Sequence, residues 1–269
     1  MPKLNPLEPH PAGTPVSLRQ IDPGSSPGIT DRDDAERHLD TERDALATLQ
    51  ERLFAEGSRS LLIVLQGMDT SGKDGVVRHV ITGMNPQGCR AVSFKRPSEE
   101  ELSHDFLWRI HQQCPAKGQV AVFNRSHYED VLAVRVRKLA PEAVWKARYE
   151  LINNFEALLV HGGTTVIKVF LHISKEEQKQ RLIARLQDPD KNWKFNPGDI
   201  DDRKLWDDYQ RAYEDLLERT NTPHAPWHII PADKKWYRNW AAACIFRATL
   251  ERMNPKPPRS TLTPQDFEF

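Results

Sequence analysis

Short apolar runs alternate along the chain with longer stretches whose apolar residues recur at helical spacing. Five runs predict strands buried on both faces, because they lack strict alternation of apolar and polar residues; they cover residues 61–66, 90–94, 119–123, 165–171 and 227–230. The stretches between them predict helices over residues 73–82, 99–113, 126–139, 141–161, 175–186, 199–220 and 234–254. This alternation indicates an α/β fold in three layers, with a mostly parallel sheet of about five strands and helices on both faces.

The two ends of the chain follow other patterns. Residues 31–54 predict a highly charged helix whose leucines share one face, so we expect that face to pack. Residues 1–30, rich in Pro, Gly and Ser, predict an extended arm, and residues 255–269 predict a Pro-rich tail. One domain is therefore expected over residues 31–254, and the arm and the charged helix are candidate interface elements between copies.

The residues after the first strand carry the strongest chemical signal, because ligands of parallel sheets bind at the carboxyl ends of the strands. The stretch from Gly67 to Gly75 reads GMDTSGKDG and fits the phosphate-binding P-loop pattern up to Lys73. Its N–H groups, the lysine and the following helix N-terminus would hold phosphate. A turn without ligand is the alternative. The candidate phosphate-binding residues of the loop are Gly67, Thr70, Ser71, Gly72, Lys73, Asp74 and Gly75.

The loop also contains two carboxylates, Asp69 and Asp74. Asp74 stands where the pattern has Ser or Thr, the residue that holds Mg²⁺. Bare carboxylates repel phosphate, so we expect this loop to recruit phosphate through a divalent cation.

The third strand ends in Asn124, and Arg125 follows it. In P-loop enzymes the strand beside the phosphate loop usually ends in an acidic residue that binds Mg²⁺, and Asn124 stands at that position. An amide oxygen still ligates Mg²⁺, although more weakly than a carboxylate. Glu129 and Asp130, one helical turn on, are further candidates. Arg125 is expected to contact phosphate. The alternative is an ordinary strand end that opens a helix capped by Ser126.

Other basic residues could extend this site. Lys95 and Arg96 follow the second strand and either face the same crevice or form a solvated turn. Arg181 and Arg185 are four residues apart on one helix face, and a polar loop follows them. This arrangement indicates a kinase lid over residues 175–200 that closes its arginines onto the transferring phosphoryl group. A surface helix with ordinary ion pairs is the alternative.

The charge balance, the cysteines and the lack of long apolar runs reduce the number of functions that the chain could have. Lys and Arg number 38, as do Asp and Glu, so the net charge of zero gives no reason to expect nucleic-acid or membrane binding. The three cysteines are far apart and show neither zinc-site spacing nor a disulfide framework. With no apolar run long enough for a membrane span and no apolar signal-peptide core, we expect a soluble cytoplasmic protein.

Three blocks together resemble the polyphosphate kinase 2 family: residues 67–75, residues 124–129, and Arg181 to Arg185 running on to KNWKF at 191–195. The resemblance covers residues 35–255. It implies a P-loop kinase fold similar to that of thymidylate kinase. It also implies Mg²⁺-dependent, reversible phosphoryl transfer between inorganic polyphosphate and a nucleotide, with Mn²⁺ as a substitute cation.

The resemblance also implies residue roles. Asp69 and Lys73 would be essential for transfer, with Asp69 as a metal ligand, Arg125 holding phosphate, and Arg181 and Arg185 as lid arginines. Metal ligands would thus come from Asp69, Asn124 and Glu129. Asn124 resembles the branch that phosphorylates both AMP and ADP. Adenine or guanine nucleotides are the expected partners, with Tyr128 as a candidate for base contact, and a homodimer or homotetramer is the expected assembly.

The implied mechanism is direct in-line displacement without a covalent intermediate. Because a phosphate acceptor is already ionised near neutral pH, no general base is expected. Two other readings compete with this one. An ATP-dependent nucleoside or nucleotide kinase of the same fold would ordinarily carry Ser or Thr at position 74. A non-catalytic sensing module would have no need of Lys73 and the lid arginines, which this chain keeps.

Overall fold

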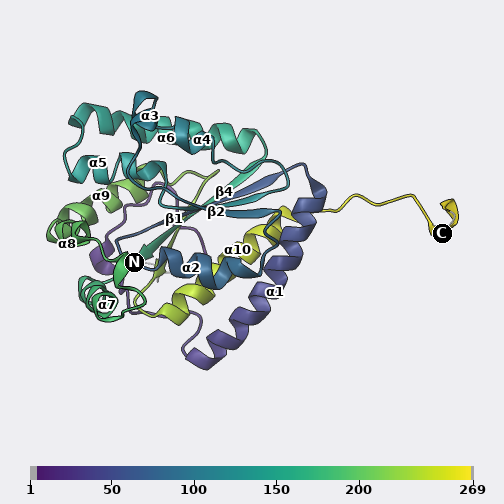
Figure 1. The fold of residues 1–269 in the computed structure, drawn as a ribbon, viewed down its shortest axis with the longest axis horizontal. Helices are drawn as coiled ribbons and strands as arrows, with labels where there is room; N and C mark the ends of the chain where they lie inside the picture. The colour runs from purple at the N-terminus through teal and green to yellow at the C-terminus, as the bar shows by residue number, and fades with distance from the viewer. Residues whose placement is uncertain (1–4, 268–269) are drawn as a thin grey trace.

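The computed structural model describes residues 5–267, which form one parallel sheet covered by helices on both faces (Figure 1). The strand order is β2-β3-β1-β4-β5. Each strand begins and ends within one residue of its predicted run: β1 Ser60–Gln66, β2 Cys89–Ser93, β3 Val120–Asn124, β4 Thr164–His172 and β5 Trp227–Pro231. The predicted three-layer α/β architecture is confirmed.

Strand β1 lies at the centre of the sheet and shows how the two cores form. Leu61, Ile63 and Leu65 pack on one face, against α1 (Arg32–Glu56), α2 (Lys73–Val80) and α10 (Lys235–Met253). Leu62 and Val64 point to the other face, against α6 (Glu142–His161) and α9 (Trp206–Arg219). Both sets are fully buried, as an apolar run without alternation predicts for a central strand.

Three predicted helices are interrupted in the structure. Residues 99–113 form α3 (Glu99–Ser103) and α4 (Trp108–His111), and the Asp105 carboxylate between them accepts a hydrogen bond from Leu107 N at 2.9 Å. Residues 126–139 form a 3₁₀ helix, η3 (His127–Asp130), and α5 (Ala133–Val136). Residues 197–219 divide into α8 (Pro197–Lys204) and α9 at Leu205. Side-chain bonds to the backbone compete with a continuous helix at such breaks.

The remaining elements are α7 (Lys175–Gln187) and the short 3₁₀ helices η1 (Leu18–Gln20), η2 (Ile81–Gly83), η4 (Asn192–Lys194) and η5 (Pro264–Asp266). None of the helices within residues 5–267 is long and apolar enough to cross a membrane.

The N-terminal segment lies on the body of the chain. His10 N donates to Trp227 O at 2.8 Å, and Leu18 is buried in the core. The leucines of α1 are covered by α10, so that face is not open to a second copy. The tail after α10 extends away from the sheet (Figure 1). Residues 1–4 of the predicted arm and 268–269 of the predicted tail lie outside the described residues.

Candidate active site

The glycine loop joins β1 to α2 at the carboxyl end of the sheet, where the sequence predicts the ligand site. Its shape requires glycine at two points. Gly67 has φ +147°, and a Cβ there would lie 2.6 Å from Leu171 O. Gly72 has φ +109° and directly precedes the first residue of α2. Thr70, at φ 63°, also adopts a left-handed backbone. A loop of this shape presents successive N–H groups to one side, as an anion site needs.

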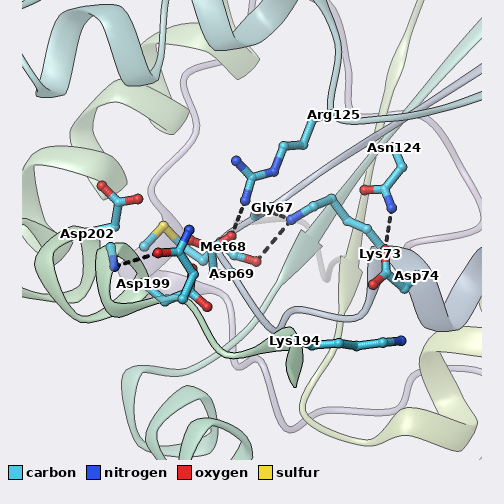
Figure 2. A network of polar contacts seen from close by, with 12 residues as sticks. Gly67, Met68, Asp69, Lys73, Asp74, Asn124, Arg125, Lys194, Asp199 and Asp202 are labelled. Carbon is cyan, nitrogen blue, oxygen red and sulfur yellow. Dashed lines mark hydrogen bonds and ion pairs between the residues drawn. The ribbon is translucent and has the colours of Figure 1, made fainter. Parts of the chain in front are cut away.

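Lys73 is buried beneath the loop (Figure 2). Its Nζ donates to Gly67 O at 2.6 Å and Met68 O at 3.2 Å. Burial and the neighbouring positive charge of Arg125 lower the pKa of Lys73 to about 8. The lysine is therefore held by the carbonyl groups of its own loop, in a setting that disfavours its charge.

Arg125 and Asp69 meet across the crevice, one from the end of β3 and the other from the loop (Figure 2). The Arg125 guanidinium donates to the Asp69 carboxylate, whose side chain is only 13% exposed. The charge of Glu129, followed by that of Asp69, raises the pKa of Arg125 against the opposing effect of burial. The structure thus brings together Lys73, Asp69, Arg125 and Glu129 from segments separated by about fifty residues of chain.

Asn124 and Asp74 form a second pair beside the first. The Asn124 amide Nδ2 donates to an oxygen of the exposed Asp74 carboxylate (Figure 2). This bond uses the nitrogen of the amide and leaves its oxygen available as a ligand. The described residues contain no group of three or more His, Cys, Asp or Glu that could hold a metal ion. A cation at Asp69 and Asn124 would need water and phosphate ligands as well, which is how Mg²⁺ is usually held.

The two predicted lid arginines have different surroundings. Arg181 is turned toward backbone: its guanidinium donates to Thr70 O at 2.9 Å, Ala232 O at 2.8 Å and Asp233 O at 2.7 Å. Within residues 5–267, Arg185 donates hydrogen bonds to Asp199 Oδ2 at 3.4 Å and to Lys194 O at 3.5 Å. In this state Arg181 supports the phosphate loop, whereas Arg185 is loosely held near the crevice.

The structure does not bring every predicted residue to the crevice. Tyr128 is fully buried, and its hydroxyl donates to Glu156 Oε1 at 2.7 Å, so the predicted nucleotide contact of Tyr128 is wrong for this structure. A 3₁₀ turn, where the sequence indicated a regular helix, directs this ring into the core. Lys95 and Arg96 are exposed after β2, which pairs with β3.

Three residues near the loop were missed from the sequence. Gln178, on α7, is buried and donates to Asp69 O at 3.2 Å. Burial and the charge of Asp69 raise the pKa of Asp199 to about 6. Arg238 lies against the loop from α10. Only Gln178 carried a sequence signal, because it is three residues before Arg181 and shares its helix face.

Comparison with known proteins identifies the family to which the chain belongs. A model of the family described as polyphosphate kinase 2 matches residues 29–258. The chain belongs to the polyphosphate kinase 2 family. The AMP/ADP-polyphosphate phosphotransferase of Meiothermus ruber is 55% identical over 214 residues, which cover 80% of each chain. The ADP-polyphosphate phosphotransferase of Rhodopseudomonas palustris is 44% identical over 235 residues, 83% of this chain and 81% of that one.

The crystal structure of polyphosphate kinase 2 from Arthrobacter aurescens has the same fold, with a TM-score of 0.91 and 48% identity over 95% of this chain and 92% of that one. This polyphosphate kinase 2 chain is therefore a phosphotransferase, as its motifs led us to expect.

Proposed function

We propose that this polyphosphate kinase 2 transfers phosphoryl groups reversibly between inorganic polyphosphate and AMP or ADP, giving ADP and ATP. The supporting observation is the convergence of Lys73 and Arg125 on the glycine loop, where Arg125 also holds the Asp69 carboxylate. Two cations that flank a loop of N–H groups suit a chain of phosphates better than a neutral ligand.

Orphaned polar atoms in the loop support phosphate binding. The hydroxyls of Thr70 and Ser71 are buried and have no hydrogen-bond partner among the described residues. Buried hydroxyls without partners are unfavourable in a folded protein. Phosphate oxygens in the loop would supply the missing partners, and Lys73 would then exchange a backbone carbonyl for a charged acceptor.

We propose Mg²⁺ as the cation, with Asp69 and Asn124 as protein ligands. It would neutralise charge on the phosphate oxygens when bound. Glu129 lies close to Arg125, so we assign it to fixing that arginine first and to the metal second. Burial lowers the pKa of His127, and its Nε2 lies 3.2 Å from Glu156 Oε1. It offers no base to the crevice, and an ionised phosphate acceptor requires none.

We further propose that residues 175–200 close over the site as a lid. In closing, Arg185 would exchange Asp199 for the transferring phosphoryl group, because its present contacts are long. Arg181 would stay on the loop carbonyls that it already holds. We also propose a homo-oligomer. Val144, Leu151 and Leu158 are 43%, 48% and 58% exposed at seven-residue intervals on α6, a spacing typical of a helix that packs on a second helix.

The test is ATP formation with AMP or ADP as acceptor and long-chain polyphosphate as the only phosphoryl donor, in the presence of Mg²⁺. ATP from both acceptors supports the proposal and the interpretation of Asn124. ATP from ADP alone contradicts the two-acceptor claim. Activity that requires ATP as donor would reassign the protein to ordinary nucleotide kinases. Lys73→Met is the matched inactive control, since it removes the charge at similar side-chain length.

A further inference from the structure

A buried arginine supports the phosphate loop from behind. Arg238 is the fourth residue of α10 and is only 3% exposed. Its guanidinium lies against the loop backbone: a Cβ on Gly72 would come within 1.8 Å of Arg238 Nη1, and one on Gly75 within 2.5 Å of Nη2. These two glycines therefore leave the space that the guanidinium occupies.

Among the described residues, no carboxylate forms an ion pair with Arg238. Its hydrogen-bond acceptors are neutral: Asn239 Oδ1 at 2.8 Å from Nη2, and Ser71 O at 3.5 Å from Nη1. The charge that affects its pKa is that of another cation, Arg181, which donates to the same Ser71 carbonyl at 3.2 Å. Burial first and this like charge second lower the pKa of Arg238 to about 9. A buried cation without an anion is costly, and proteins normally pair it.

We propose that Arg238 is a positioning residue whose missing counter-ion is phosphate bound in the loop. It fixes the Ser71 carbonyl from behind and adds positive potential through the thin glycine backbone to the ligand on the other side. The proposal rests on the proposed function, because it requires the loop to bind phosphate. It predicts that Arg238 contributes to ligand affinity and contributes little to the stability of the ligand-free fold.

Two substitutions separate charge from packing. Arg238→Met removes the charge at similar length, and Arg238→Lys keeps the charge but loses the planar fork. Arg252→Met is the control, because Arg252 is exposed near the end of the same helix. Inorganic tripolyphosphate with Mg²⁺ is the probe, measured by calorimetry and by the ligand-induced shift in melting temperature of the full chain. The KM for polyphosphate and kcat are measured in parallel.

We expect Arg238→Met to leave the melting temperature of the ligand-free protein unchanged or higher and to weaken tripolyphosphate binding about tenfold. Arg238→Lys should restore most of the affinity, and Arg252→Met should match the wild type. The change should appear in the KM for polyphosphate more than in kcat. If the methionine variant does not fold, Arg238→Gln gives the same comparison.

Two results would overturn the proposal. Unchanged tripolyphosphate affinity together with a lower ligand-free melting temperature in Arg238→Met would make Arg238 a packing residue only. An equal loss of affinity in Arg238→Lys and Arg238→Met would show that charge is not the cause. Failure of the proposed function is seen separately, in the wild-type arm, as the absence of any tripolyphosphate binding.

Discussion

A fully buried ion pair links the core to the segment that carries Arg125, and its removal gives a quantitative test. Lys168 on β4 and Glu156 on α6 are both 0% exposed, with Nζ 2.6 Å from Oε2. Lys168 also donates to Tyr128 Oη at 2.9 Å and to Thr220 O at 2.7 Å. Tyr128 is three residues after Arg125, so this network fixes the turn from which the arginine reaches Asp69.

The perturbation is Glu156→Gln, which keeps the shape and leaves Lys168 charged and buried without an anion. Removing one partner of a buried pair costs about 3–5 kcal/mol. At about 2.1 cal/mol/K for each residue, 269 residues give an unfolding entropy of about 0.56 kcal/mol/K. The melting temperature should therefore fall by about 5–9 °C.

The assay is chemical and thermal unfolding, with the exposed pair Glu142 and Lys146 on the same helix as the control. Glu142→Gln should leave the melting temperature nearly unchanged, because exposed pairs are screened by water. A loss below about 1 kcal/mol in Glu156→Gln would refute the argument, since it would mean that the network relaxes or admits water.

The pH dependence of the stability of a second variant, Lys168→Met, tests whether Lys168 lowers the pKa of Glu156. In the wild type burial opposes the charge of Glu156, but Lys168 prevails and keeps the pKa of Glu156 below its ordinary value. Lys168→Met removes that charge, so burial should raise the pKa of Glu156 above its unfolded value. Such a variant loses stability as pH rises through the raised pKa. Its deficit relative to wild type should be smaller at pH 5 than at pH 8, and a deficit independent of pH would contradict the assignment.

Three further predictions follow from the site and the surface. The kcat/KM for polyphosphate should fall as pH rises through about 8, where Lys73 of the free enzyme loses its proton. The kcat should fall only at higher pH, because bound phosphate raises the pKa of Lys73. A kcat/KM profile that stays flat to about pH 10 would exclude a role for the Lys73 charge in binding. Arg185→Gln should lower kcat about 10³-fold with little change in melting temperature, whereas Arg181→Gln should also destabilise the fold, because Arg181, unlike Arg185, donates to loop carbonyls; equal thermal effects would contradict this. Leu151→Glu should lower the mass measured by light scattering, whereas Leu102→Glu, on a more exposed leucine elsewhere, should not; an unchanged mass in Leu151→Glu would exclude the α6 surface as the interface.

The strands and most helices were predictable because their signals are local. A run such as Leu61 to Leu65 can only be buried, and Gly162 ends its helix where expected. The broken helices were not predictable in this way. The turn at His127 and Tyr128 is held by Glu156, 28 residues further along the chain from Tyr128, and no property of residues 126–139 reveals that partner.

The candidate site also divides into residues that local motifs predicted and residues that only the tertiary structure revealed. The glycine loop and the Asn124–Arg125 strand end are contiguous motifs, and a parallel sheet brings strand ends together, so their proximity followed from sequence order. Arg238 and Asp199 are single residues in helices without a motif, and only tertiary packing places them near the loop. Tyr128 shows the opposite error, because its position beside a motif suggested a contact that burial prevents.

The contacts of the glycine loop give a physical reason for the direction in which its N–H groups point. Lys73, Arg181 and Arg238 all donate to carbonyl groups of residues 67–71. In a peptide unit the N–H points away from the C=O, so cations that hold these carbonyls on one side turn N–H groups toward the other. We therefore expect the three cations to act on bound phosphate twice, through their charge and through the backbone that they orient. Such a double role would allow a loop carrying two carboxylates, Asp69 and Asp74, to favour a polyanion.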